Sequence, residues 1–532
     1  MMRSSLDALV VRDNRIFAYG WVFHPDSVTH GIRLLVTLED GTQVSLPVIS
    51  GKERSDVAAA YVQYPNATNS GWFAYVAWDG APARSMALAG YLENGIGFTC
   101  ELGNVNETDA VGNDGQLHRL LRSLRRSLLR YQEASVRGRD VGRAAPGLLS
   151  ETAVLALIEK TLAACGQSRC SLVIDHDLGG GANRYRRDWI AAKLRQRPFV
   201  LVITFETISL RPVLEIVSAQ EASRVTLVDE AVVAAVARSG YIDEVLFNNA
   251  VSFARPADVP AWLLAFKAIP ETTLVFAVHD YFSVCPSQFL LNDSGRFCRV
   301  PEMEECLRCL PRNENEFSLL FTSHHMPRWR ALWGQVLMAA DKIVCFSESS
   351  RTLLRRAYPA LDGARMVIVP HVIEPFSRTV NVDAEAPLHV GVVGAIGMHK
   401  GAAVIRSLAS EIARRGVSYR ISVIGTLEIP YNPAIIDVTG PYKRAELVGL
   451  IEKSGANIFL LPSICPETFS YVTQELMALG VPLACFDFGA PMERVVGYRL
   501  GRVFPLDSAS GLLDNLLQFH SDAAAIQRHC LQ

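Results

Sequence analysis

The chain has 532 residues, and at about 150 residues per domain this length predicts three or four domains. Its 52 Lys and Arg residues against 54 Asp and Glu residues leave a net charge of −2, so we expect no nucleic-acid partner. No apolar stretch approaches the roughly 18 residues needed to cross a bilayer, and no signal-peptide core precedes Arg12. We therefore expect a cytoplasmic protein.

Residues 1–105 carry the pattern of an accessory antiparallel β domain. Short alternating runs such as RIFAYGWVF and MALAGYL are separated by turn dipeptides, of which Asp40-Gly41 suits a two-residue hairpin. Alternation places one face of each strand in a core and the other in water. The sequence thus predicts a small sandwich.

Residues 106–150 predict a basic helical linker. Between residues 115 and 143 there are eight Arg against two acidic residues, and the leucines recur at helical spacing. The favoured interpretation is a helix that docks its leucine face on the next domain and leaves its basic face in water. The alternative is peripheral contact with the anionic inner face of the plasma membrane.

From residue 151 onward, apolar strands such as CSLVIDHD, RVTLVD and HVGVVGA alternate with stretches of helical length. Continuous apolar strands with helical spacers are typical of parallel sheets covered on both faces. The sequence predicts an α/β fold with two tandem Rossmann-like, doubly wound domains, over 151–380 and 381–532. Ligands of such folds bind at the carboxyl ends of the strands.

Two strand-to-helix turns are rich in glycine. Glycines let a backbone approach a ligand closely, and a helix N-terminus offers amide donors to phosphate. The alternative is a flexible loop for the triple glycine and a plain structural turn for the segment that contains Lys400. The first turn contains Gly179, Gly180 and Gly181, and the second contains Gly394, Gly397 and Lys400.

Acidic and histidine side chains follow other strands. Glu467 precedes a predicted helix, and Glu475, eight residues later, lies near the same face of it. A helix-capping acid and a solvent-facing acid are the alternatives for the two. His279 ends the strand TTLVFAVHD, where a structural His-Asp pair is the alternative, and His324 and His325 are weaker candidates.

The segments GAIGMHKG and PETFSYVTQELMALGVPLACFDFG together resemble the donor-binding half of glycosyltransferase family 4, whose members are retaining enzymes of GT-B fold. The resemblance is to the bacterial surface-polysaccharide type, with an extra N-terminal β domain. It covers about residues 170–500. One position departs from the family, because Ala395 stands where an arginine commonly follows the first glycine.

The resemblance implies roles for individual residues. Glu467 would contact the sugar hydroxyls, Glu475 the ribose hydroxyls, and Lys400 the diphosphate. The amides of Phe469 and Ser470 would lie near the sugar and diphosphate, and the triple glycine would border the diphosphate. His279 would face the donor sugar, which makes Glu467, His279 and Lys400 the catalytic candidates.

The function that follows is transfer of a hexosyl or deoxyhexosyl group from a nucleotide-diphosphate sugar to a glycan or lipid-linked glycan acceptor. The resemblance implies retention of configuration, no catalytic metal, and a role in O-antigen, capsule or lipopolysaccharide synthesis. One alternative is a nucleotide-sugar epimerase of the same architecture. Another is a non-catalytic nucleotide- or glycan-binding protein.

Four of the eleven cysteines fall within 25 residues, in a predicted insertion over 285–309. A pair two residues apart can bind one metal ion, and two further thiolates would close a tetrahedral structural zinc site. The alternative is four unrelated cysteines. The candidates are Cys285, Cys298, Cys306 and Cys309.

Overall fold

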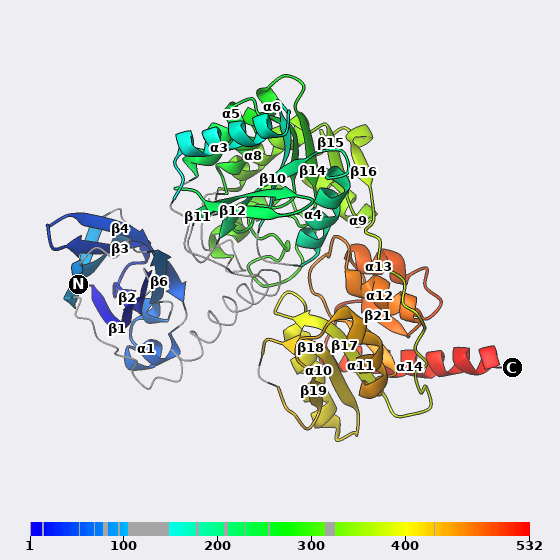
Figure 1. Cartoon of the computed structure of the whole chain (residues 1–532). Coiled ribbons are helices and arrows are strands. Elements are labelled where there is room, and N and C mark those ends of the chain that lie inside the picture. Colours follow the sequence, from blue (N-terminus) through cyan, green and yellow to red (C-terminus); the bar gives the residue numbers. More distant parts are fainter. Residues whose placement is uncertain are drawn as a thin grey trace. The chain divides into compact units, whose positions relative to one another are not determined.

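The computed structural model places most of the chain in two compact units, one over 1–143 with 206–211 and the other over 144–205 with 212–532 (Figure 1). The helix expected within 115–143 lies outside the described residues. The described residues are 2–12, 15–52, 54–68, 70–77, 83–93, 96–104, 148–176, 180–206, 211–228, 230–253, 256–313, 325–429 and 431–531.

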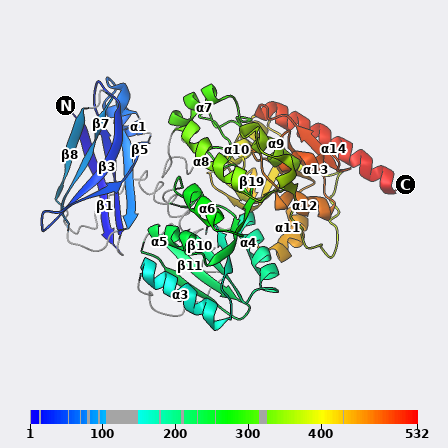
Figure 2. The same ribbon diagram turned by 90° about the horizontal axis from the view of Figure 1, so that it is seen from above.

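The described residues of the first unit form two four-stranded antiparallel sheets, with the short helix α1 (Ser55–Ala60) beside them in the chain (Figure 2). Alternate residues of both sheets meet in one core, where Val22 and Trp72 from one sheet pack with Leu34 and Leu88 from the other. The predicted sandwich is confirmed. One sheet has the order β1 (Arg3–Arg12), β2 (Arg15–Phe23), β6 (Gly71–Ala77), β5 (Ile49–Lys52), and the other β4 (Gln43–Pro47), β3 (Thr29–Leu38), β7 (Ala83–Leu92), β8 (Gly97–Asn104).

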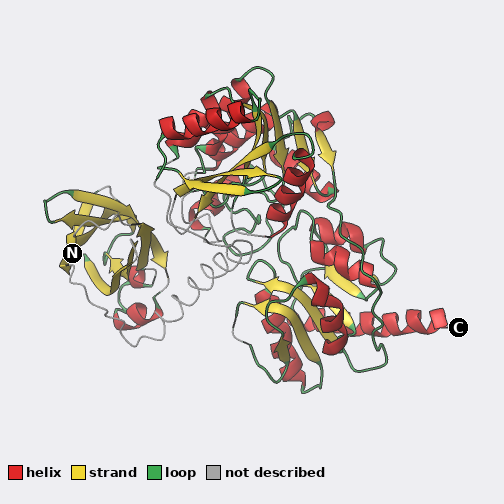
Figure 3. Cartoon of the chain, viewed as in Figure 1, coloured by secondary structure: helices red, strands yellow, loops and turns green. Residues whose placement is uncertain are grey.

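The second unit begins with an eight-stranded sheet. Its central strand β9 is buried at every position, as expected for a sheet covered on both faces (Figure 3). RVTLVD, expected as a parallel strand, instead supplies β12, which pairs antiparallel with β11 at the sheet edge. The order is β12 (Ala222–Thr226), β11 (Arg211–Ser218), β10 (Phe199–Glu206), β9 (Cys170–Ile174), β13 (Ile242–Phe247), β14 (Thr273–Ala277), β15 (Lys342–Cys345), β16 (Met366–Ile368).

The helices of this first α/β domain alternate with its strands, as the spacing of the apolar runs predicts. They are α3 (Glu151–Ala164), α4 (Gly180–Lys193), α5 (Ala231–Arg238), α6 (Val259–Ala268), α7 (Met303–Cys309), α8 (Met326–Ala339) and α9 (Glu348–Ala357). Helix α7 belongs to the insertion that follows β14.

The second sheet of this unit is parallel throughout and has six strands. Alternate residues of β17 face opposite cores: Val392 packs with α10 and α14, and Val393 packs with α11 and α12. The order is β19 (Ile436–Val438), β18 (Arg420–Leu427), β17 (His389–Ile396), β20 (Ile458–Leu461), β21 (Leu483–Phe486), β22 (Gly501–Phe504). The helices are α10 (Ala402–Arg415), α11 (Leu447–Ser454), α12 (Tyr471–Leu479), α13 (Gly489–Val495) and α14 (Ala509–Leu531).

Both sheets of this unit reverse their strand order at one point. From β17 the chain passes through α10 to β18 on one side, and from the adjacent β20 it passes through α12 to β21 on the other. In the first sheet the same reversal lies between β9 and β13. The predicted α/β fold with two Rossmann-like sheets is confirmed, and each reversal leaves an opening at the carboxyl ends of two neighbouring strands.

Candidate functional site

Lys400 and Glu467 meet at the reversal point of the second sheet. Lys400 lies in the loop between β17 and α10, Glu467 in the loop between β20 and α12, and their Nζ and Oε2 atoms are 2.8 Å apart. Burial alone would raise the pKa of Glu467, but Lys400 and the hydroxyls of Ser463 and Ser470 hold it below its usual value. Burial likewise opposes the charge of Lys400, yet Glu467 leaves the lysine pKa raised. Both groups are therefore charged at neutral pH.

The two loops that carry this pair run against each other. Gly401 has φ +85°, and a Cβ there would overlap the carbonyl oxygen of Pro462, so only glycine fits. Ser470 has φ +68°, which is unusual for a residue with a side chain. Its hydroxyl nevertheless caps α12 by accepting a hydrogen bond from the Thr473 amide at 3.4 Å. Backbone strain of this kind is concentrated at functional sites.

Glu475 lies two turns along from Glu467, on the buried side of α12. Its side chain is 9% exposed, so the interpretation as a solvent-facing acid is wrong. Arg444 donates from Nε to its Oε1 at 2.8 Å. The guanidinium of Arg444 also lies 4.1 Å from the centre of the Phe376 ring. Glu475 is thus a carboxylate with a fixed cationic partner.

His279 follows β14 at the carboxyl edge of the first sheet. Its Nε2 lies 2.8 Å from Oδ1 of Asn248, and its ring stacks on Phe346 with centroids 4.5 Å apart. Burial, with the neighbouring histidines 371 and 176, lowers its pKa well below the usual value, so the ring is neutral. Asp280 accepts a hydrogen bond from Asn249 at 2.7 Å, and burial raises its pKa to about 6.

Direct contacts join the edges of the two sheets. The Thr468 hydroxyl donates to the carbonyl oxygen of His279 at 2.9 Å. Phe469 and Tyr471 pack into the same hydrophobic cluster as Val173 of β9. The structure therefore brings His279, Lys400, Glu467 and Phe469 to one locality, although they come from both domains.

The glycines of the two predicted strand-to-helix turns lie at several places around the Lys400–Glu467 pair. Gly179 lies outside the described residues, whereas Gly180 begins α4 with φ +81°. A Cβ on Gly181 would lie 3.0 Å from the Tyr471 ring, so a small residue is required where α4 meets the second domain. Gly394 has φ +121° at the end of β17, and a Cβ on Gly397 would lie 2.7 Å from the carboxylate of Glu428.

Two functional candidates here are absent from the sequence prediction. His371, in the segment after β16, stacks on Phe346 at 4.1 Å and on Tyr471 at 5.0 Å. Burial, with Arg494 and Arg184, lowers its pKa to about 4. Arg494 of α13 lies 3.9 Å from the centre of the Phe469 ring and donates to the Phe469 carbonyl. A histidine a few residues after a strand end is a signal that could have found His371, but nothing in the sequence marks Arg494.

Of the two weaker histidine candidates, His324 lies outside the described residues. His325 caps α8, because its Nδ1 accepts a hydrogen bond from the Arg328 amide at 3.2 Å. This role is structural.

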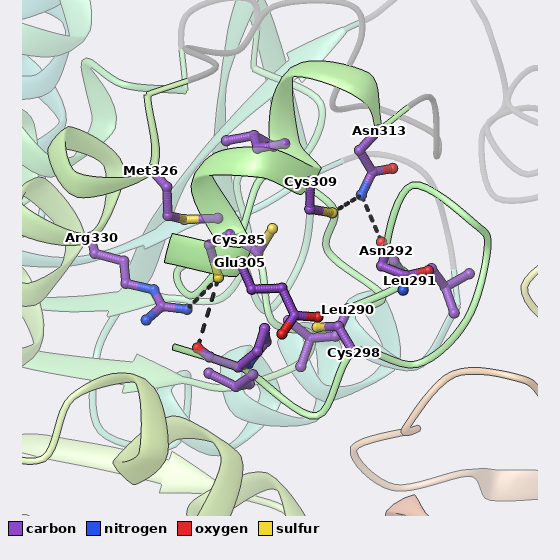
Figure 4. Close-up of a pocket in the computed structure, with 14 residues that line it drawn as sticks. Cys285, Leu290, Leu291, Asn292, Cys298, Glu305, Cys309, Asn313, Met326 and Arg330 are labelled. Atoms are coloured by element: carbon purple, nitrogen blue, oxygen red, sulfur yellow. Dashed lines mark hydrogen bonds between the residues drawn. The ribbon is translucent and has the colours of Figure 1, made fainter. Parts of the chain in front are cut away.

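The four clustered cysteines line a single pocket inside the first α/β domain (Figure 4). Cys306 Sγ accepts from Arg330 and Cys309 Sγ accepts from Asn313, both at 3.7 Å. Burial raises the pKa of all four thiols, that of Cys298 to about 11. The fold therefore brings the four cysteines together in space.

The zinc prediction finds no support. Among the described residues, no group of three or more His, Cys, Asp or Glu side chains is arranged to hold a metal ion. A zinc site made from these cysteines would need all four sulfurs directed at one point, whereas the sulfurs of Cys306 and Cys309 accept hydrogen bonds from Arg330 and Asn313.

Membrane spans are a separate question. In the part of the chain that the structure describes, no helix has both the length and the apolar composition that crossing a bilayer requires.

No protein-family model matches the chain, and no curated protein matches it either. Solved structures do. Sucrose-phosphate synthase from Thermosynechococcus elongatus is 16% identical, with 67% of this chain and 90% of that chain covered and a TM-score of 0.44. HepE from Anabaena, in complex with UDP-glucose, is 15% identical, with 67% and 93% covered and a TM-score of 0.41. The lipopolysaccharide outer core galactosyltransferase WaaB is 10% identical, with 66% and 90% covered and a TM-score of 0.42. Similarity this distant transfers no activity to the chain.

Proposed function

We propose that the protein is a retaining glycosyltransferase that moves a hexosyl or deoxyhexosyl group from a nucleotide-diphosphate donor to a glycan or lipid-linked glycan acceptor. The observation that carries the proposal is the Lys400–Glu467 pair at the reversal point of the second sheet, joined to His279 through Thr468. Ligands of doubly wound sheets bind at such points.

The chemical task is to stabilise the negative charge that builds on the departing nucleotide diphosphate. Lys400 supplies a full positive charge, and the N-termini of α10 and α12 supply oriented backbone amides. Arg494 adds a second cation at the Phe469 end of α12, which offsets the absence of an arginine at Ala395. In this proposal Lys400 and Arg494 balance the charge of the diphosphate.

The remaining residues orient the donor. Glu467 accepts hydrogen bonds from sugar hydroxyls, and Glu475 accepts them from the ribose while Arg444 holds its carboxylate in place. His279 is neutral at pH 7 and adds no positive charge beside Lys400; because its Nε2–H donates to Oδ1 of Asn248, its Nδ1 accepts a hydrogen bond from a sugar hydroxyl. Together these groups hold the anomeric carbon against an acceptor hydroxyl.

Calorimetric titration with GDP, UDP and dTDP tests the donor site. We expect micromolar binding of one of them, and its loss in Glu475→Ala. Glu452→Ala is the matched control, because Glu452 is also ion-paired, to Arg378, but lies in the last turn of α11 at the opposite edge of the sheet. Failure of all three nucleotides to bind would overturn the proposal and favour a protein without donor chemistry.

We further propose a cytoplasmic role in surface-polysaccharide synthesis, with peripheral membrane contact through residues 115–143. Eight arginines in that segment would be drawn to anionic lipid. Liposome pelleting with and without the segment tests the contact. Equal pelleting of the two proteins would contradict it.

A further inference from the structure

The insertion over 285–309 reaches the second α/β domain at the loop that carries Lys400. The ring of Phe289 stacks on the ring of His399, with centroids 4.0 Å apart and planes 6° from parallel. His399 directly precedes Lys400 in the chain. A second aromatic contact of the insertion, Phe297 on Phe488, has centroids 5.3 Å apart and joins the insertion to the N-terminus of α13 instead.

Several contacts hold the conformation of the lysine loop. Its own backbone closes a turn, with the Gly401 amide donating to Met398 and the Ala402 amide to Gly397, each at 3.0 Å. The carbonyl of His399 accepts from the Ile464 amide at 3.1 Å, which ties the loop to the strand-to-helix loop of Glu467. The stack on Phe289 ties the same residue to the first domain.

Phe289 lies in a turn whose backbone is hydrogen-bonded on both sides. Leu290 has φ +53°, and it is buried in the cysteine pocket, while Phe289 stays partly exposed and contacts His399. The neighbouring backbone is held on both sides, because the Tyr281 amide donates to Gln288 at 3.1 Å and the Cys298 amide to Leu290 at 2.9 Å. Strain at Leu290 is maintained by this surrounding structure.

We propose that Phe289 is a positioning residue for Lys400: its stack on His399 holds the lysine loop in the geometry that receives the donor diphosphate. The inference rests on the proposed function for the identity of the ligand. Its structural part, that Phe289 orders the loop, stands on the contacts alone. A stacked aromatic pair contributes enough to change an equilibrium about 2- to 12-fold.

Hydrogen–deuterium exchange tests the structural part on the full chain without any ligand. In Phe289→Ala, amides of residues 397–402 should exchange about 2- to 12-fold faster than in the wild type. Phe289→Tyr should restore the wild-type rate, and Phe297→Ala, which removes the other aromatic contact, should leave these amides unchanged. Unchanged exchange in Phe289→Ala would overturn the inference.

Nucleotide titration tests the positioning of Lys400. Phe289→Ala should weaken binding of the nucleoside diphosphate about 2- to 12-fold and leave the matching monophosphate unaffected, since the lysine acts on the diphosphate. Equal weakening of both nucleotides would show a general structural role and overturn the inference. If the wild type binds no nucleotide, the proposed function fails while the exchange result still decides the role of Phe289.

Discussion

The side-chain hydroxyl of Thr468 donates a hydrogen bond to the backbone carbonyl oxygen of His279 at 2.9 Å, across 189 residues of sequence. Thr468 follows Glu467, and His279 lies two residues beyond the end of β14 of the other sheet. This single bond therefore places the carboxylate loop of one domain against the histidine of the other.

Replacing this hydroxyl should loosen the junction. Thr468→Val keeps the shape and removes the donor, so the His279 carbonyl loses its partner. We expect a loss of about 1 kcal/mol of transition-state stabilisation, measured as roughly a fivefold fall in kcat/KM for donor hydrolysis. Thr468→Ser, which keeps the hydroxyl, should behave as wild type. Identical kinetics for Val and Ser would remove any role for this bond.

Glu467→Gln should abolish donor turnover. The substitution leaves Lys400 without its ionic partner, but the Lys400 side chain is 34% exposed, so water offsets part of the cost. We expect about 2 kcal/mol of destabilisation and at least a 100-fold fall in turnover. Thermal unfolding and donor hydrolysis are measured side by side, with Glu452→Gln as control. Turnover that survives in a folded Glu467→Gln protein is incompatible with the assigned site.

Gly401→Ala should destabilise the protein much more than Gly416→Ala. Both glycines flank α10 with positive φ, +85° and +64°, so both variants carry backbone strain. At Gly416 a Cβ meets nothing within 4 Å, whereas at Gly401 it overlaps the Pro462 carbonyl. We expect the free energy of unfolding to fall by about 1 kcal/mol in Gly416→Ala and by at least about 3 kcal/mol in Gly401→Ala, measured by calorimetric unfolding. Equal costs would mean that the two loops are not in close contact.

His371 should make the protein sensitive to acid. Burial and two arginines lower its pKa from 6.5 to about 4 in the folded state. Between these values the unfolded state binds more protons, so the free energy of unfolding falls as pH falls from 6.5 toward 4. His371→Phe keeps a stacking ring and removes the titration, so its Tm should drop less than the wild-type Tm between pH 7 and 5. Parallel Tm profiles would refute this account.

The titration of Asp280 should change stability with pH in the direction opposite to that of His371. Burial raises its pKa from 3.8 to about 6, so in that window the folded state binds more protons. The free energy of unfolding then falls as pH rises from about 4 to 6, by up to about 3 kcal/mol. Asp280→Asn removes this dependence, so the Tm of the variant relative to wild type should increase from pH 4 to pH 7. A difference that does not vary with pH would show that the carboxyl group has the same pKa in the folded and unfolded states.

Local pattern was enough to predict much of this protein. Period-two alternation marks the sandwich, and continuous apolar strands with helical spacers mark the two α/β sheets. The motif around Lys400 and the eight-residue spacing of Glu467 and Glu475 could be found in the same way, because each lies in one loop or one helix. These features are encoded by neighbours in the chain.

Relationships between distant segments required the tertiary structure. The contact of Lys400 with Glu467 follows from the adjacency of β17 and β20, and strand order is set by how helices pack on the sheet. The recruitment of Arg494, the pairing of Glu475 with Arg444 and the stack of Phe289 on His399 have no local signature. The cysteines illustrate both cases. Their spacing predicted that they converge. The packing around them decided the directions of their side chains, and the described residues hold no metal-ligand set.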